Sequence, residues 1–90
     1  MITAQRQALA ELSTKPLAQI QRETAITWAY RAWAATELAS EAGAGGDGDR
    51  FMQLTCDAGE YEHEALEHAA LSGDDGVLAS VRRIVKTGAL

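Results

Sequence analysis

Apolar residues dominate the segment from Pro16 to Ala42, which contains no glycine and no second proline. From Ala25 to Ala35 they cover nearly the whole circumference of a helix. A helix that is apolar all round is buried on most sides, and a chain of 90 residues cannot easily bury one by itself. The pattern predicts a long helix at a subunit interface that involves Trp28 or Trp33. The alternative is a central helix in a compact monomeric bundle.

Three further stretches show helical spacing of apolar positions. Residues 3–12 predict a short helix, which Pro16 separates from the long one. Residues 50–71 predict a second long helix, and residues 77–86 a shorter closing one. The apolar positions of the second long helix recur every three or four residues; they are Phe51, Leu54, Ala58, Tyr61, Ala65 and Ala69.

Two glycine-rich breaks separate the last three helices. The first is 43–49, where Gly43 suits the position after a helix and Asp47 or Asp49 can cap the next helix. The second is 72–76. We therefore expect one all-α domain over 1–90. It consists of a short N-terminal helix, a long antiparallel helical hairpin and a C-terminal helix, and it associates into a helical-bundle oligomer.

Composition narrows the possible partners. Hydrophobic residues make up 47% of the chain and aromatics 6%, and 13 acidic against 8 basic residues give a net charge of −5. This balance argues against nucleic-acid binding, and no apolar run is long enough for a membrane span. A single cysteine, Cys56, excludes an internal disulfide. It favours a reducing cytoplasm, and we expect its thiol to be buried and structural.

The candidate chemistry lies in an E-x-x-H pattern formed by Glu60 and His63. Residues three apart share one face of a helix, so a carboxylate and an imidazole in this spacing can bind one cation. In carboxylate-bridged di-iron bundles, a glutamate from one helix joins an E-x-x-H from another. Glu23, which lies among apolar neighbours, is the candidate for that first glutamate, and Tyr30 lies two turns further along the same face.

These residues resemble the ferritin-like superfamily, and the short chain resembles half-ferritins such as encapsulated ferritins. The spacing of seven from Glu23 to Tyr30 and the run Glu60-Tyr-Glu-His63 carry the resemblance, which covers about residues 17–71. It implies two Fe(II) ions at a dimer interface, oxidised by oxygen. Glu23, Glu60 and His63 of each chain would be ligands, and Tyr30 would lie near the metal. The C-terminal residues show no convincing cargo-loading peptide.

The spacing along the hairpin raises a geometric objection. If the chain turns near Gly45, Glu23 lies level with about Glu67 and His68, and Glu60 lies about 10 Å away along the axis. Either the site is assembled between subunits, or the ligands are Glu64 and His68, an i, i+4 pair level with Glu23.

A reading without metal explains the same residues. The glutamates of 60–67 can form a solvated acidic face that satisfies His63 and His68. The chain would then be a structural or interaction module that dimerises through the tryptophan-bearing helix, or a small helical partner of a larger complex. The sequence leaves open whether the protein is an enzyme, and whether it binds iron or another divalent metal.

Overall fold

Three α-helices make up the part of the chain that the computed structural model describes, residues 17–90. They are α2 (Leu17–Ala44), α3 (Gly48–Ser72) and α4 (Asp75–Thr87). No strand occurs within these residues, so the all-α class is confirmed. The helix expected over 3–12 lies outside the described residues. None of the three helices is long and apolar enough to cross a membrane.

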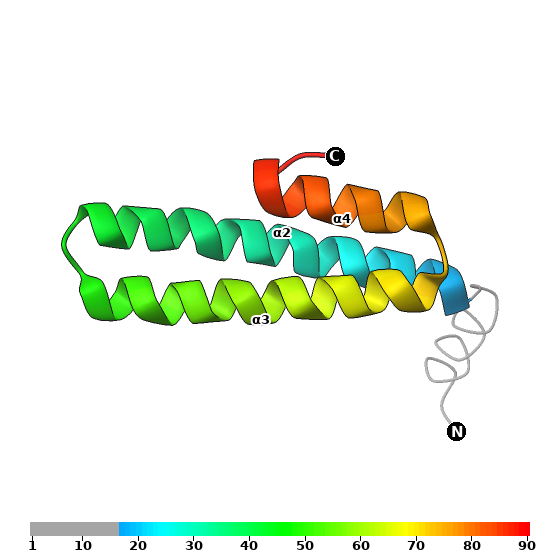
Figure 1. Ribbon diagram of the computed structural model, residues 1–90, viewed down its shortest axis with the longest axis horizontal. Helices are drawn as coiled ribbons and strands as arrows, with labels where there is room; N and C mark the ends of the chain where they lie inside the picture. Colours follow the sequence, from blue (N-terminus) through cyan, green and yellow to red (C-terminus); the bar gives the residue numbers. More distant parts are fainter. Residues whose placement is uncertain (1–16) are drawn as a thin grey trace, which may run out of the picture.

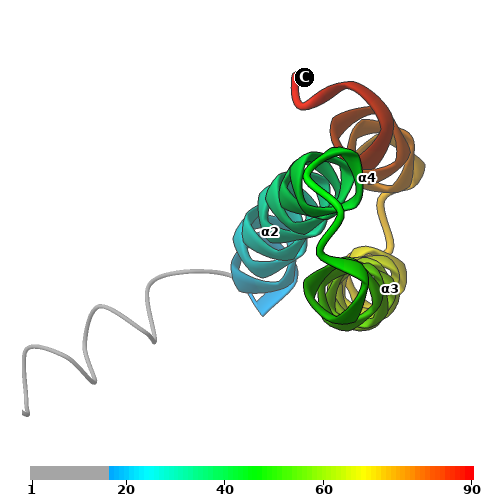
Figure 2. The same cartoon turned by 90° about the vertical axis from the view of Figure 1, so that its left-hand side faces the viewer.

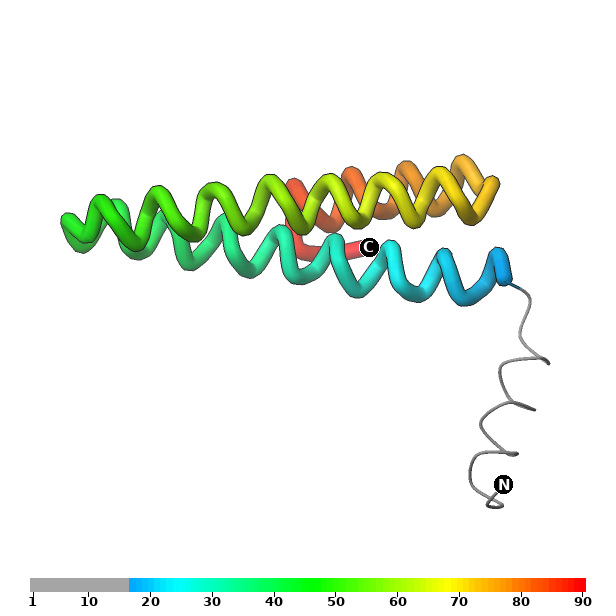
Figure 3. The backbone as a smooth tube through the Cα atoms, turned by 90° about the horizontal axis from the view of Figure 1, so that it is seen from below, coloured from blue at the N-terminus to red at the C-terminus, as the bar shows by residue number. Residues whose placement is uncertain are grey.

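The two long helices lie side by side and run in opposite directions, joined by a short loop at one end (Figure 1, Figure 3). The short helix α4 runs parallel to α2 and covers only the half of the pair that lies away from this loop. Viewed along the helices, α4 lies against one side of the α2–α3 pair, and no other described helix covers the opposite side (Figure 2).

The loop between α2 and α3 is closed by Gly46 and Asp47. Gly46 has a φ of 80°, and the Asp47 carboxylate accepts a hydrogen bond from the Arg50 N–H at 3.1 Å, which confirms an N-cap at this aspartate. Gly43 was expected to follow the helix, but it lies inside α2. The lack of a side chain at Gly43 instead leaves room for Phe51, because a Cβ there would lie 3.1 Å from the Phe51 ring.

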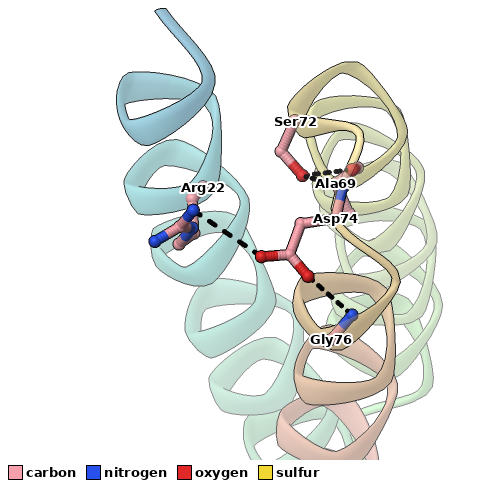
Figure 4. Close-up of polar contacts among 5 residues, drawn as sticks. All are labelled: Arg22, Ala69, Ser72, Asp74 and Gly76. Atoms are coloured by element: carbon pink, nitrogen blue, oxygen red, sulfur yellow. Dashed lines mark hydrogen bonds and ion pairs between the residues drawn. The ribbon is translucent and has the colours of Figure 1, made fainter. Parts of the chain in front are cut away.

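The turn between α3 and α4 is tied to α2 through Asp74 (Figure 4). One oxygen of its carboxylate accepts a hydrogen bond from the Gly76 N–H at 2.8 Å and caps α4. The other lies 3.6 Å from the guanidinium of Arg22. Ser72 is buried, and its hydroxyl donates to the Ala69 carbonyl at 2.6 Å. The cap of α4 is therefore also a link between α4 and the first turns of α2.

Alanines form the contact between the two long helices. Ala25 and Ala29 of α2 and Ala65 and Ala69 of α3 are all at most 1% exposed. Such small side chains let helix axes approach to the short end of the usual 8–10 Å range. Branched side chains of α4 complete this core, and they are Val77, Val81 and Ile84.

The far end of α4 is fixed by a glycine under a tryptophan. Gly88 has a φ of 77°, and its N–H bonds to the Ile84 carbonyl at 2.7 Å. The Trp33 ring lies so close that a Cβ on Gly88 would overlap it. Trp33 is therefore used within the chain, where it holds the C-terminal turn of α4 against α2.

We expect Ala29→Leu to lower the free energy of unfolding by about 1–3 kcal/mol, because overpacking a filled contact forces the helices apart. Ala70→Leu is the control, since Ala70 is exposed on α3. It should change stability by less than about 0.5 kcal/mol. Urea unfolding followed by circular dichroism measures both, and equal stability of the two variants would contradict close alanine packing.

We expect Gly88→Ala to cost more stability than Gly46→Ala. Both glycines have positive φ, so both variants pay a backbone cost of about 1 kcal/mol. A Cβ at Gly46 meets nothing within 4 Å, whereas one at Gly88 meets Trp33. Thermal unfolding of the two variants measures the difference, and an equal loss would show that Trp33 does not pack on this glycine.

Candidate functional site

Two side-chain pairs define the register of α2 and α3. The Nδ1 atom of His68 lies 2.5 Å from the Oε1 atom of Gln21, and the ring centroids of Trp28 and Tyr61 lie 5.5 Å apart. In an antiparallel pair of helices, residues at the same level have numbers with a constant sum, and in both of these pairs the sum is 89. Glu23 is therefore level with Leu66, and Glu60 lies six residues further along, about 9 Å at 1.5 Å per residue.

Glu23 also lies on the wrong side of its helix for a site within one chain. It is exposed, and it lies about 160° around α2 from the buried Ala25. Gln19 donates a hydrogen bond to its carboxylate at 3.3 Å, while the neighbouring Arg22 pairs with Asp74. Tyr30, seven residues on, is likewise exposed.

Glu60 and His63 are both exposed on the outer side of α3. The Nε2 atom of His63 lies 3.3 Å from the Oε1 atom of Glu67. An open hollow of about 880 Å³ lies along this surface, lined by Trp28, Cys56, Gly59, Glu60, Tyr61, His63 and Glu64. Within residues 17–90 no three His, Cys, Asp or Glu side chains come together to hold a metal ion. A single chain therefore does not bring Glu23, Glu60 and His63 together.

Glu64 and His68 are placed differently, because both are half-buried beside α2. Their side chains are 43% and 25% exposed, against 71% for His63. The Nε2 atom of His68 lies 3.7 Å from the Oε2 atom of Glu64, and its Nδ1 atom contacts Gln21. Of the two histidines, His68 is therefore the one held by a contact from another helix.

Trp28 lies at the centre of an aromatic and cationic cluster. Its ring is tilted by 37° against Tyr61, and the Arg31 guanidinium lies 4.9 Å from its centroid. Trp33 lies against the end of α4, and Trp28, five residues earlier, lies about 140° around α2 from it. The two tryptophans therefore do not share a surface.

We call the surface around Trp28 the open face. It is the side of the α2–α3 pair that no described helix covers (Figure 2). On each helix its positions recur every three or four residues. By helical spacing from Trp28 and Tyr61 they are Leu17, Gln21, Thr24, Trp28, Arg31, the buried Ala35 and Leu38 of α2, and Leu54, Asp57, Tyr61, Glu64, His68 and Leu71 of α3. The opposite side of α2 carries the α4 contacts of Arg22 and Trp33.

Reasoning from sequence missed the roles of Gln21 and Arg31. Neither residue belongs to a motif, and each becomes prominent only through a partner, His68 or Trp28. The signal that could have found them is the shared spacing with Trp28, because Gln21, Trp28 and Arg31 fall on one line of the helix.

Cys56 corrects a further expectation, because its thiol is exposed and not buried. It lies on α3 nine residues before the buried Ala65, which places it about half a turn around the helix from the alanine contact. The apolar stripe predicted for this helix, which includes Leu54, Ala58 and Ala65, leaves Cys56 out, so the spacing already indicated an exposed thiol.

Comparison of the chain with protein-family models, with curated proteins and with solved structures gave no match.

We expect neutral His68 to carry its proton on Nδ1. The Oε1 atom of Gln21 can only accept a hydrogen bond, so the ring nitrogen that contacts it has to donate. Long-range ¹⁵N–¹H NMR spectra distinguish the two tautomers. Gln21→Leu removes the acceptor and should move the ring toward the Nε2–H tautomer. The signals of exposed His63 serve as an internal control, and a wild-type His68 in the Nε2–H form would contradict the geometry.

Proposed function

We propose that this chain is a helical interaction module without catalytic chemistry of its own, which associates with a second copy through the open face. The observation that carries the proposal is the length of that face. Apolar side chains lie at both ends and in the middle of it: Leu17 with Leu71, Trp28 with Tyr61, and Leu38 with Leu54. Leu17 and Leu71 are 70% and 67% exposed. Polar residues lie between these pairs, and we take the three pairs on one side of the molecule as support for an interaction site.

Charges on the open face favour a second copy as the partner. Arg31 on α2 and Asp57 on α3 lie at the same level and line one hollow of about 310 Å³ together with Leu38, Leu54 and others. A two-fold interface places the same surface on both partners, so it can set the Arg31 of each copy against an acidic residue of the other. A surface that carries both signs is suited to self-association.

The shape of the helix pair supports the same partner. Four-helix bundles bury a shared core between four long helices, and α2 with α3 supplies two of them. The helix α4 lies against the other side of the pair, so a second copy that packs on the open face does not displace it (Figure 2). On this proposal Trp28, and not Trp33, is the tryptophan at the interface.

A metal-binding function of the ferritin-like kind is a second proposal. It is supported by the E-x-x-H pair, because Glu60 and His63 are both exposed and accessible to another chain. Iron held by Glu23, Glu60 and His63 would require ligands from different copies, with Glu23 of one copy facing α3 of the other. That arrangement uses a surface other than the open face, so the two proposals predict different interfaces.

We place the protein in the cytoplasm as part of the same proposal. Exposed thiols are stable to oxidation in a reducing compartment, and the one cysteine of the chain is exposed.

We expect the double variant Leu17→Glu with Leu71→Glu to dissociate the dimer. Both side chains are exposed in the single chain, so the fold should tolerate the change. Loss of two buried leucines removes roughly 3 kcal/mol or more per copy, which raises the Kd at least ~100-fold. Light scattering coupled to size-exclusion chromatography measures the mass over a range of concentrations.

Met52→Glu is the matched control, because Met52 is 66% exposed and, nine residues before Tyr61, lies about half a turn around α3 from the open face. It should leave the dimer intact. A wild-type chain that is monomeric at micromolar concentration would rule out self-association. Dissociation by Met52→Glu with an intact double variant would move the interface to the outer side of α3.

A further inference from the structure

His68 and Glu64 lie one helical turn apart on the open face, and their facing atoms are too far apart for a hydrogen bond. Nε2 of His68 and Oε2 of Glu64 are separated by 3.7 Å, whereas such bonds span 2.7–3.2 Å. A tetrahedral zinc ion bonds nitrogen and oxygen at about 2.0–2.2 Å, which holds two such ligand atoms roughly 3.4 Å apart. The observed separation is close to that of two atoms bound to one metal ion. The 3.3 Å between His63 and Glu67 is equally close, so the choice of this pair depends on burial and on the contact from α2.

Gln21 orients the imidazole for this role. Its side-chain oxygen lies 2.5 Å from Nδ1 and can only accept a hydrogen bond, so we expect Nδ1 of the neutral ring to donate and Nε2 to keep its lone pair. Metal-binding histidines almost always donate their other ring N–H to such an oxygen, which fixes the tautomer and the ring orientation. His63 is 71% exposed and its ion pair is with Glu67 of its own helix, whereas His68 is also in contact with Gln21 of α2.

We propose that Glu64 and His68 form half of a divalent-metal site that a second copy completes across the open face. This inference rests on the proposed self-association. One chain supplies two ligand atoms, and a structural zinc site takes four. No third His, Cys, Asp or Glu within residues 17–90 joins them. A two-fold axis near this pair brings two glutamates and two histidines together, with Gln21 of each copy holding its own histidine.

Cobalt(II) titration of the full chain tests the site, because tetrahedral Co(II) absorbs visible light and Zn(II) displaces it. We expect one Co(II) per two chains, with an absorption band that is lost in Glu64→Gln and in His68→Ala. Gln21→Leu leaves the ligands in place and should weaken binding about 10- to 100-fold. His63→Ala and Glu60→Gln are the controls and should bind as the wild type does. Circular dichroism establishes that each variant is folded.

The outcomes separate this inference from the proposed function. A dimer by light scattering that gives no Co(II) band, or whose band survives in His68→Ala, overturns the metal site and leaves self-association standing. A band lost in His63→Ala but kept in His68→Ala assigns the metal to the E-x-x-H pair and also overturns the inference. A wild-type chain that stays monomeric and binds one Co(II) per chain overturns both the shared site and the proposed function.

Discussion

The contact between the alanines of α2 and α3 is the constraint on which the rest of the structure depends. Four methyl groups, from Ala25, Ala29, Ala65 and Ala69, bring the two long helices close together. Each methyl buries little apolar surface, worth about 0.8 kcal/mol. The close approach therefore has to be completed by larger side chains from elsewhere, and α4 provides them on one side only.

The open face exists because α4 covers the alanine contact on one side of the pair only. Larger side chains cannot lie between the helices, so they lie along the rim, where Trp28 stacks on Tyr61 and Gln21 meets His68. These contacts cross from α2 to α3 and leave part of each side chain exposed. The residues that fix the register of the pair are thus also the ones offered to a partner. The same side chains therefore stabilise the fold and form the surface proposed for a partner.

Sequence patterns predicted the helices well because each is bounded by strong local signals. The glycine-rich breaks and the Asp47 cap act over a few residues, so they can be read without knowing the fold. The side of α2 that faces its partners could not be read, since apolar residues surround it and an alanine looks alike in a core or on a surface. The same ambiguity assigned Glu23 to an inward role, although the structure places it outside. The pairing of Gln21 with His68 depends on tertiary packing, which no local pattern encodes.

The constant register of the hairpin has a consequence for how the chain folds. Partners near the loop are separated by few residues, and partners at the far end, such as Gln21 and His68, by 47. The entropic cost of closing a loop is smallest for the pairs nearest the loop. We therefore expect the contacts between α2 and α3 to form from the loop outward. The helix α4 should pack last, because it packs at the end of the pair far from the loop, where Ala25 and Ala69 come together after the contacts near the loop. Folding would thus begin at the loop end, which α4 does not cover, and finish at the far end, where α4 completes the core.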